Sequence, residues 1–214
     1  NMVIMAPKDE PECRAMLSTG LVVDGPSAVR YPRGAGMGVE AGQSLEPLPV
    51  GKAELLRQGG EGPHRLRVAL LAFGSMVAPA LGAAEALNAT VINMRFIKPL
   101  DLDTLAWAAN HHDLLVTIEE NVIAGGAGSG CAEALVAMED RIPMIPIMHL
   151  GLPDRFIDQG DHAKLLSLEG LDAAGIEASV RRHAAQVQSK TPSATGQSED
   201  SAGKPGPVSL TLAS

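Results

Sequence analysis

The 214-residue sequence predicts an α/β fold of three layers, in which helices cover both faces of a mostly parallel sheet. From about residue 65 onward, short apolar runs alternate with helix-like segments, a pattern typical of strand–helix–strand units. The run at 114–118 is short, largely apolar and rich in Val, Ile and Leu, as expected for a strand buried on both faces.

The first part of the chain is expected to form a strand and a helix. Residues 1–7 form an apolar run, and a buried strand at the start of the sequence indicates a piece of something longer. Asp9 is a candidate helix cap, since Glu12 follows three residues later at the spacing of a capping box. Gly25 and Pro26 then end the helix.

A second strand is expected at 27–31, where Pro32 stops it because proline cannot donate to a central ladder. Residues 34–50 carry many Gly and Pro and show no periodicity, so they are expected to be a linker.

The regular region that follows contains four expected strands and four expected helices. The strands cover residues 66–73, 90–96, 114–120 and 143–150. The helices run from Gly74-Ser75 to residue 87, from a cap at Asp101 through residue 106, over 131–138, and over 172–187.

Composition excludes several classes of protein. A net charge of −8 with 2% aromatic residues argues against nucleic-acid binding. No apolar run approaches the roughly 18 residues of a membrane span. Cys13 and Cys131 form no metal or redox pattern, so we expect reduced thiols in a cytoplasmic protein. The histidines also lack ligand spacing, and we predict no metal site.

The glycine-rich turn at 125–130 permits two interpretations. Glycines allow tight packing of a strand against a helix, or they expose amides that bind an anion at a helix N-terminus. Cys131 stands where a dinucleotide fingerprint needs its third glycine, and Ala127 and Cys131 flank Ser129 where a nucleophile elbow needs glycines. Neither motif is present.

Arg33 is the candidate binding residue. It follows the strand expected at 27–31, at the sheet edge where ligands of open α/β sheets bind. A guanidinium there can grip a phosphate or carboxylate with two parallel hydrogen bonds, although a solvated arginine is the alternative. Arg30 has the opposite strand parity, so cooperation between the two is not expected.

Glu119 and Glu120 are the other candidates, since paired carboxylates can serve as acid and base. Adjacent strand residues point to opposite faces, which favours hydrogen bonds in packing or at an interface. The residues alone therefore predict no complete catalytic set.

Five segments of the chain resemble the thiamine-diphosphate-dependent transketolase family. They follow in the family's order between residue 1 and about residue 186, at 2–14, 25–34, 94–101, 119–130 and 151–154. The resemblance implies that residues 1–45 are the end of a pyrimidine-binding domain with its linker. Residues 50–186 would then be the transketolase C-terminal domain. Residues 187–214 have no counterpart in the family, and their Ser, Pro, Gly and Thr content predicts a disordered tail.

The resemblance is to the branch of the family that joins pyruvate to D-glyceraldehyde 3-phosphate with loss of CO₂, at the entry to isoprenoid, thiamine and pyridoxal biosynthesis. It implies thiamine diphosphate and Mg²⁺ as cofactors, a homodimer, and a phosphate-anchoring role for Arg33 in the Tyr-Pro-Arg-Gly segment. The family's Gly-Asp-Gly motif, its activating glutamate and its active-site histidines are absent. We therefore expect a C-terminal portion that is inactive alone.

Two other interpretations stay open. The chain could belong to another transketolase-like enzyme, such as a 2-oxoacid dehydrogenase subunit, although the complete Tyr-Pro-Arg-Gly segment and the loop at 151–154 favour the first branch. It could also be a non-catalytic module that dimerises or binds a small anion at 125–130.

Overall fold

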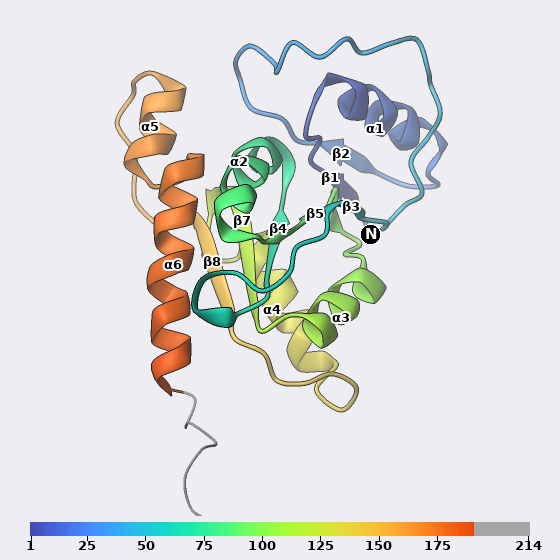
Figure 1. The fold of residues 1–214 in the computed structure, drawn as a ribbon. Helices are drawn as coiled ribbons and strands as arrows, with labels where there is room; N and C mark the ends of the chain where they lie inside the picture. Colours follow the sequence, from blue (N-terminus) through green and yellow to red (C-terminus); the bar gives the residue numbers. More distant parts are fainter. Residues whose placement is uncertain (191–214) are drawn as a thin grey trace, which may run out of the picture.

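The computed structural model describes residues 1–190, which form two sheets with helices packed against them (Figure 1). The strands are β1 (Val3–Met5), β2 (Ser27–Val29), β3 (Glu54–Arg57), β4 (Val68–Ala72), β5 (Thr90–Asn93), β6 (Phe96–Lys98), β7 (Leu114–Val122) and β8 (Ile147–Leu152). The α-helices are α1 (Glu10–Val22), α2 (Val77–Leu87), α3 (Leu102–His111), α4 (Ala127–Ala137), α5 (His162–Leu168) and α6 (Ala173–Lys190). Short 3₁₀ turns are η1 (Pro63–Arg65) and η2 (Gly74–Met76).

The larger sheet has the strand order β3-β5-β4-β7-β8, parallel except for β3 at its edge. Successive residues of the central strand β4 enter two different cores. Leu70 packs with α2 and α6 on one face, whereas Leu71 packs with α3 and α4 on the other. This alternation produces the expected three-layer α/β fold, which is confirmed.

The smaller sheet has the order β2-β1-β6. Helix α1 connects the parallel strands β1 and β2, and β6 pairs with β1 in the antiparallel sense. The cap at Asp9 is confirmed, because its Oδ1 accepts from the Glu12 amide at 2.9 Å. The return bond of the capping box differs from the expected one, since the Glu12 carboxylate accepts from the Lys8 amide at 2.7 Å.

The prediction of one strand at 90–96 was wrong, because β5 and β6 occupy this range and belong to different sheets. Arg95 between them has φ of +57°, a left-handed conformation that interrupts an extended strand. Phe96 then turns into a separate small core with Met5 and Met16.

Other boundaries differ by a few residues. The edge strand β3 and the seven-residue helix α5 were not predicted. Helix α4 begins at Ala127, so Gly128 and Gly130 belong to its first turns rather than to the preceding turn. Helix α6 continues to Lys190, and residues 191–214 of the expected tail lie outside the described residues.

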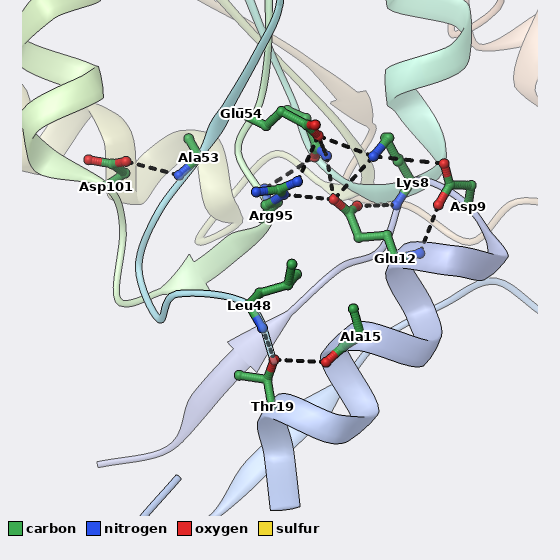
Figure 2. Close-up of polar contacts among 11 residues, drawn as sticks. Lys8, Asp9, Glu12, Ala15, Thr19, Leu48, Ala53, Glu54, Arg95 and Asp101 are labelled. Carbon is green, nitrogen blue, oxygen red and sulfur yellow. Dashed lines mark hydrogen bonds and ion pairs between the residues drawn. The ribbon is translucent and has the colours of Figure 1, made fainter. Parts of the chain in front are cut away.

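A buried charged cluster joins the two sheets (Figure 2). The Glu12 side chain is 2% exposed, and its Oε1 accepts from Arg95 Nε at 2.7 Å and from Asn93 Nδ2 at 2.8 Å. Glu54 on β3 pairs with Lys8 Nζ at 3.1 Å and with Arg95 Nη2 at 2.8 Å. Burial alone would raise the pKa of Glu54, but the Lys8 hydrogen bond and the Arg95 charge hold it below its usual value.

The end of the linker and the residues just after it are hydrogen-bonded to α1 and to the start of α3 (Figure 2). Thr19 Oγ1 donates to Ala15 O at 2.8 Å and accepts from the Leu48 amide at 2.7 Å. Asp101, whose capping of α3 is confirmed by a bond from the Thr104 amide, also accepts from the Ala53 amide at 2.9 Å. Residues 34–50 contain no helix or strand, as expected for a linker.

Helix α4 approaches the larger sheet closely at Gly128. An added Cβ there would collide with Thr117 Oγ1 and His149 Nδ1, which are hydrogen-bonded to each other at 2.7 Å. At Gly130 the nearest atom to an added Cβ is Leu100 Cδ1 at 3.6 Å, an ordinary contact.

We predict that Gly128→Ala lowers the free energy of unfolding by about 1–3 kcal/mol, since the methyl group has no room. Gly130→Ala is the matched control and should be neutral or stabilising by about 0.5–1 kcal/mol, because alanine favours a helix interior. Urea denaturation of both variants measures the difference. Equal stability of the two variants would contradict the packing described.

We predict that Glu12→Gln lowers the free energy of unfolding by about 2–4 kcal/mol, because it leaves Arg95 and Lys8 without their buried anion. Glu177→Gln removes an exposed ion pair with Arg181 at 2.7 Å and should cost less than about 0.5 kcal/mol. Thermal or urea unfolding checks both values, and similar small losses in the two variants would rule out a central role for Glu12.

Candidate functional site

The carboxyl ends of strands from both sheets meet at one place. Ala6 after β1, Arg30 after β2, Phe73 after β4 and Glu120 near the end of β7 line one small hollow. Arg30 Nη2 donates to Glu120 O at 2.7 Å across the gap between the sheets. Because ligands of parallel α/β sheets bind beyond the carboxyl ends of the strands, this junction is the candidate functional site.

A cleft of about 420 Å³ opens beside this hollow. The start of α1, the loop after β2, the η2–α2 corner and α5 form its walls, chiefly through Pro7, Cys13, Tyr31, Pro79 and Leu166. Its surface is largely apolar, and Asp9, Ser75 and His162 are among the polar residues that line it. A mostly apolar cleft with a few polar groups is the usual form of a small-molecule site.

The Glu120 carboxylate links two elements that form walls of the cleft. Its Oε2 accepts from Ser75 Oγ at 2.6 Å, and its Oε1 lies 2.6 Å from His162 Nε2. These bonds join the end of β7 to the η2 turn and to the first residue of α5. The position of the cleft wall at α5 therefore depends on this carboxylate.

Glu119 points the opposite way, as the strand parity predicted. Its carboxylate is buried and accepts from the amides of Ala127 and Gly128, both at 2.8 Å. The anion at the N-terminus of α4 is therefore an internal side chain. The hypothesis of an external anion site at 125–130 is not supported, since Glu119 occupies the two amides that such a ligand would need.

Arg33 lies four residues after the end of β2 and is exposed. Its neighbours Tyr31, Pro32 and Gly34 line the cleft, so Arg33 lies at the rim. Within residues 1–190 the Arg33 side chain makes no hydrogen bond or ion pair, in contrast to Arg30. Its assignment as a substrate-binding residue stays a prediction.

Three other titratable side chains, His112, His149 and Cys131, lie in partly or fully buried surroundings. His112 Nδ1 donates to Ala108 O at 2.9 Å, and its Nε2 lies 2.8 Å from Thr90 Oγ1. Burial lowers the pKa of His112 and of His149 and raises that of Cys131 to about 12. These groups therefore favour their neutral forms.

The described part of the chain offers no group of three His, Cys, Asp or Glu side chains placed to hold a metal ion. The sequence also lacks the Gly-Asp-Gly motif, and the Glu119 carboxylate already occupies the Ala127 and Gly128 amides at the start of α4. The residues present thus do not fit a Mg²⁺–diphosphate group by themselves.

Among residues 1–190, no helix is long and apolar enough to cross a membrane.

The sequence did not predict two groups of side-chain contacts. The Glu12 cluster joins residues up to 83 positions apart, and the Ser75–Glu120–His162 contacts join three separate elements. The only local signal was the capping-box spacing of Glu12, which suggests a helix start and no tertiary role.

Comparison with known proteins places these features in a family. The model of the domain described as "Transketolase, C-terminal domain" matches residues 51–176. The 1-deoxy-D-xylulose-5-phosphate synthase of Ralstonia nicotianae is 58% identical over 193 residues, which are 90% of this chain and 30% of the relative. The synthase of Chromobacterium violaceum is 56% identical over 185 residues, 86% of this chain and 29% of the relative.

A solved structure agrees with the sequence comparison. A chain described as a split gene transketolase, inactive beta4 tetramer, matches with a TM-score of 0.71 and 28% identity. The match covers 88% of this chain and 59% of that one. The present chain spans about 30% of the length of the curated relatives, in a region that includes their transketolase C-terminal domain. The chain belongs to the transketolase family.

Proposed function

We propose that this chain supplies the C-terminal part of a 1-deoxy-D-xylulose-5-phosphate synthase. The observation that carries the proposal is the 58% identity to the Ralstonia nicotianae synthase over 90% of the chain. The reaction would join pyruvate to D-glyceraldehyde 3-phosphate with loss of CO₂ and would require thiamine diphosphate and Mg²⁺. Because the described residues do not fit that cofactor, other parts of the enzyme would hold it, and this chain alone would be inactive.

In this proposal the two parts of the chain have different roles. Residues 1–45 are the end of the pyrimidine-binding domain with its linker, and residues 50–186 form the C-terminal domain that supports assembly of a homodimer. The sheets support this division, because β1 and β2 lie in the smaller sheet whereas all five strands of the larger sheet come from residues 54–152. The cytoplasmic localisation expected from the sequence stays a prediction.

Arg33 would anchor the phosphate of D-glyceraldehyde 3-phosphate. Three features support this role: the Tyr-Pro-Arg-Gly segment, the position at the rim of the cleft, and a guanidinium that makes no hydrogen bond or ion pair within residues 1–190. Its charge complements a phosphate dianion, and its planar fork can bind two phosphate oxygens at once. Bound in this way, the phosphate would orient the aldehyde end of the substrate.

A non-catalytic assembly subunit is the second candidate function. The structural relative is described as the inactive tetramer of a split gene transketolase, so a separate chain of this kind can assemble without activity. Small-anion binding at 125–130 has lost support because Glu119 takes the amides there.

The experiment that tests the proposal is a chimera. This chain replaces the matching 30% of the Ralstonia nicotianae synthase, and formation of 1-deoxy-D-xylulose 5-phosphate and CO₂ is measured with both cofactors present. We expect product from the chimera and none from the chain alone. A folded chimera that forms no product would contradict the proposed function and leave the assembly role.

We predict that Arg33→Ala in the active chimera raises the KM for D-glyceraldehyde 3-phosphate by about 10- to 100-fold, since a charge-assisted contact contributes about 1.5–3 kcal/mol. The KM for pyruvate should change little, because pyruvate carries no phosphate. Arg182→Ala is the control, because Arg182 is also exposed but lies on α6, away from the loop after β2. An unchanged KM and kcat/KM for the aldehyde in Arg33→Ala would exclude the anchoring role.

A further inference from the structure

The segment that carries Arg33 is attached at its two ends and makes no backbone hydrogen bond between them. Strand β2 ends at Val29, and the chain then passes around α1 before it reaches β3 (Figure 1). Within residues 1–190, no backbone N–H or C=O of residues 31–37 takes part in a hydrogen bond. The position of this segment, which we call the Arg33 loop, therefore depends on the residues that flank it.

Arg30 attaches the start of the Arg33 loop to both sheets. Its backbone amide donates to Met5 O at 2.8 Å, which extends the pairing of β2 with β1 by one residue. Its side chain reaches across to the larger sheet, where Nη2 donates to Glu120 O at 2.7 Å and to Asn121 Oδ1 at 3.4 Å. Because the guanidinium donors have a fixed planar geometry, two acceptors define how the side chain is oriented.

The acceptors of Arg30 lie where β7 departs from regular pairing. The pairing of β4 with β7 ends at Ile118, and the register between β7 and β8 shifts between Ile118 and Val122. A shift of this kind redirects the groups of a strand and is common beside functional sites. Glu120 lies within the shifted stretch, and its carboxylate is bound to η2 and α5. Arg30 is therefore bonded to a part of the larger sheet that is itself held in place.

Glu10 at the start of α1 attaches the other end of the Arg33 loop. Its Oε1 accepts from the Gly38 amide at 2.7 Å. This bond holds the pKa of Glu10 below its usual value, so the acceptor is a carboxylate at neutral pH. A Cβ added at Gly36 would collide with the same carboxylate, which shows that the loop lies directly against α1.

We propose that Arg30 and Glu10 are positioning residues for the phosphate of the aldehyde substrate, because they fix the backbone from which the Arg33 guanidinium extends. Neither residue would touch the phosphate, since Arg30 is bonded to β7 and Glu10 is an anion. The proposal rests on the proposed function, which assigns the phosphate to Arg33. A loop that is fixed before binding loses less entropy when Arg33 contacts the substrate, so the affinity for the phosphate depends on both attachments.

Kinetics of the active chimera test the positioning role. We expect Arg30→Met and Glu10→Ala each to raise the KM for D-glyceraldehyde 3-phosphate by about 5- to 10-fold, less than Arg33→Ala, because Arg33 is then misplaced and not lost. The KM for pyruvate should stay unchanged, and so should kcat/KM for D-glyceraldehyde, which lacks the phosphate. Arg30→Lys should recover part of the affinity, since its ammonium group can also donate to Glu120 O. A general loss of structure would instead affect all three substrates.

Arg14→Met is the matched control. Arg14 also donates from its side chain to a backbone carbonyl, Ser44 O at 3.0 Å, but in a part of the linker beyond the Arg33 loop. This variant should leave the KM of both substrates unchanged. In a chimera that already carries Arg33→Ala, Arg30→Met should have no further effect on the aldehyde KM, because the two residues act as a unit. Equal losses with and without Arg33, or an unchanged aldehyde KM in Arg30→Met and Glu10→Ala, would overturn the proposal.

A measurement on the full chain without substrate separates this proposal from the proposed function. We expect the NMR order parameters of the Arg33 and Gly34 amides to fall from about 0.8 in the wild type to about 0.6 or less in Arg30→Met, and to stay unchanged in Arg14→Met. Unchanged values in Arg30→Met would overturn the positioning role even where the chimera is active. A folded but inactive chimera would contradict the proposed function and the phosphate role with it, whereas lower order parameters in Arg30→Met would still support the attachment of the loop.

Discussion

The arrangement of the two sheets depends on the buried carboxylate of Glu12. A carboxylate that is 2% exposed would be costly in isolation, and here Arg95, Asn93 and the Lys8 amide satisfy it. The partners come from two parts of the junction: Lys8 follows β1, whereas Asn93 and Arg95 lie at the corner between β5 and β6. Glu54 completes the charge balance from β3. The smaller sheet therefore cannot move relative to the larger one without exposing or unpairing these charges.

This constraint determines where a ligand can bind. With the sheets fixed, the residues after β1 and β2 face the ends of β4 and β7, and the small hollow forms between them with the cleft beside it. The glycine-rich segment at 125–130 was a candidate anion site in the sequence, but the Glu119 carboxylate already binds the amides at that helix N-terminus. In the part of the chain that the structure describes, the Arg33 side chain at the rim has no hydrogen bond or ion pair. The candidate site is thus at the junction of the two sheets and not at the most conspicuous motif.

The parts predicted from the sequence are those set by short-range chemistry. Asp9 and Asp101 were predicted as caps because the accepting side chain and the amide lie three residues apart. Strand β7 was predicted because its buried first half is rich in Leu, Val and Ile. The break between β5 and β6 was missed, since the reason for it is pairing of β6 with β1 about 90 residues earlier in the chain. For the same reason the Glu12–Arg95 pair, 83 positions apart, leaves no local pattern.

The most direct test of this account is native-state hydrogen exchange of the amides in β1 and β4. If the Glu12 cluster makes the two sheets one cooperative unit, the Met5 amide in β1 should open with nearly the same free energy as the Leu70 amide in β4, and both should respond equally to added urea. Exchange at Met5 that is faster by several kcal/mol and insensitive to urea, while Leu70 stays protected, would show that the N-terminal segment opens by itself. That result would contradict the central role of Glu12.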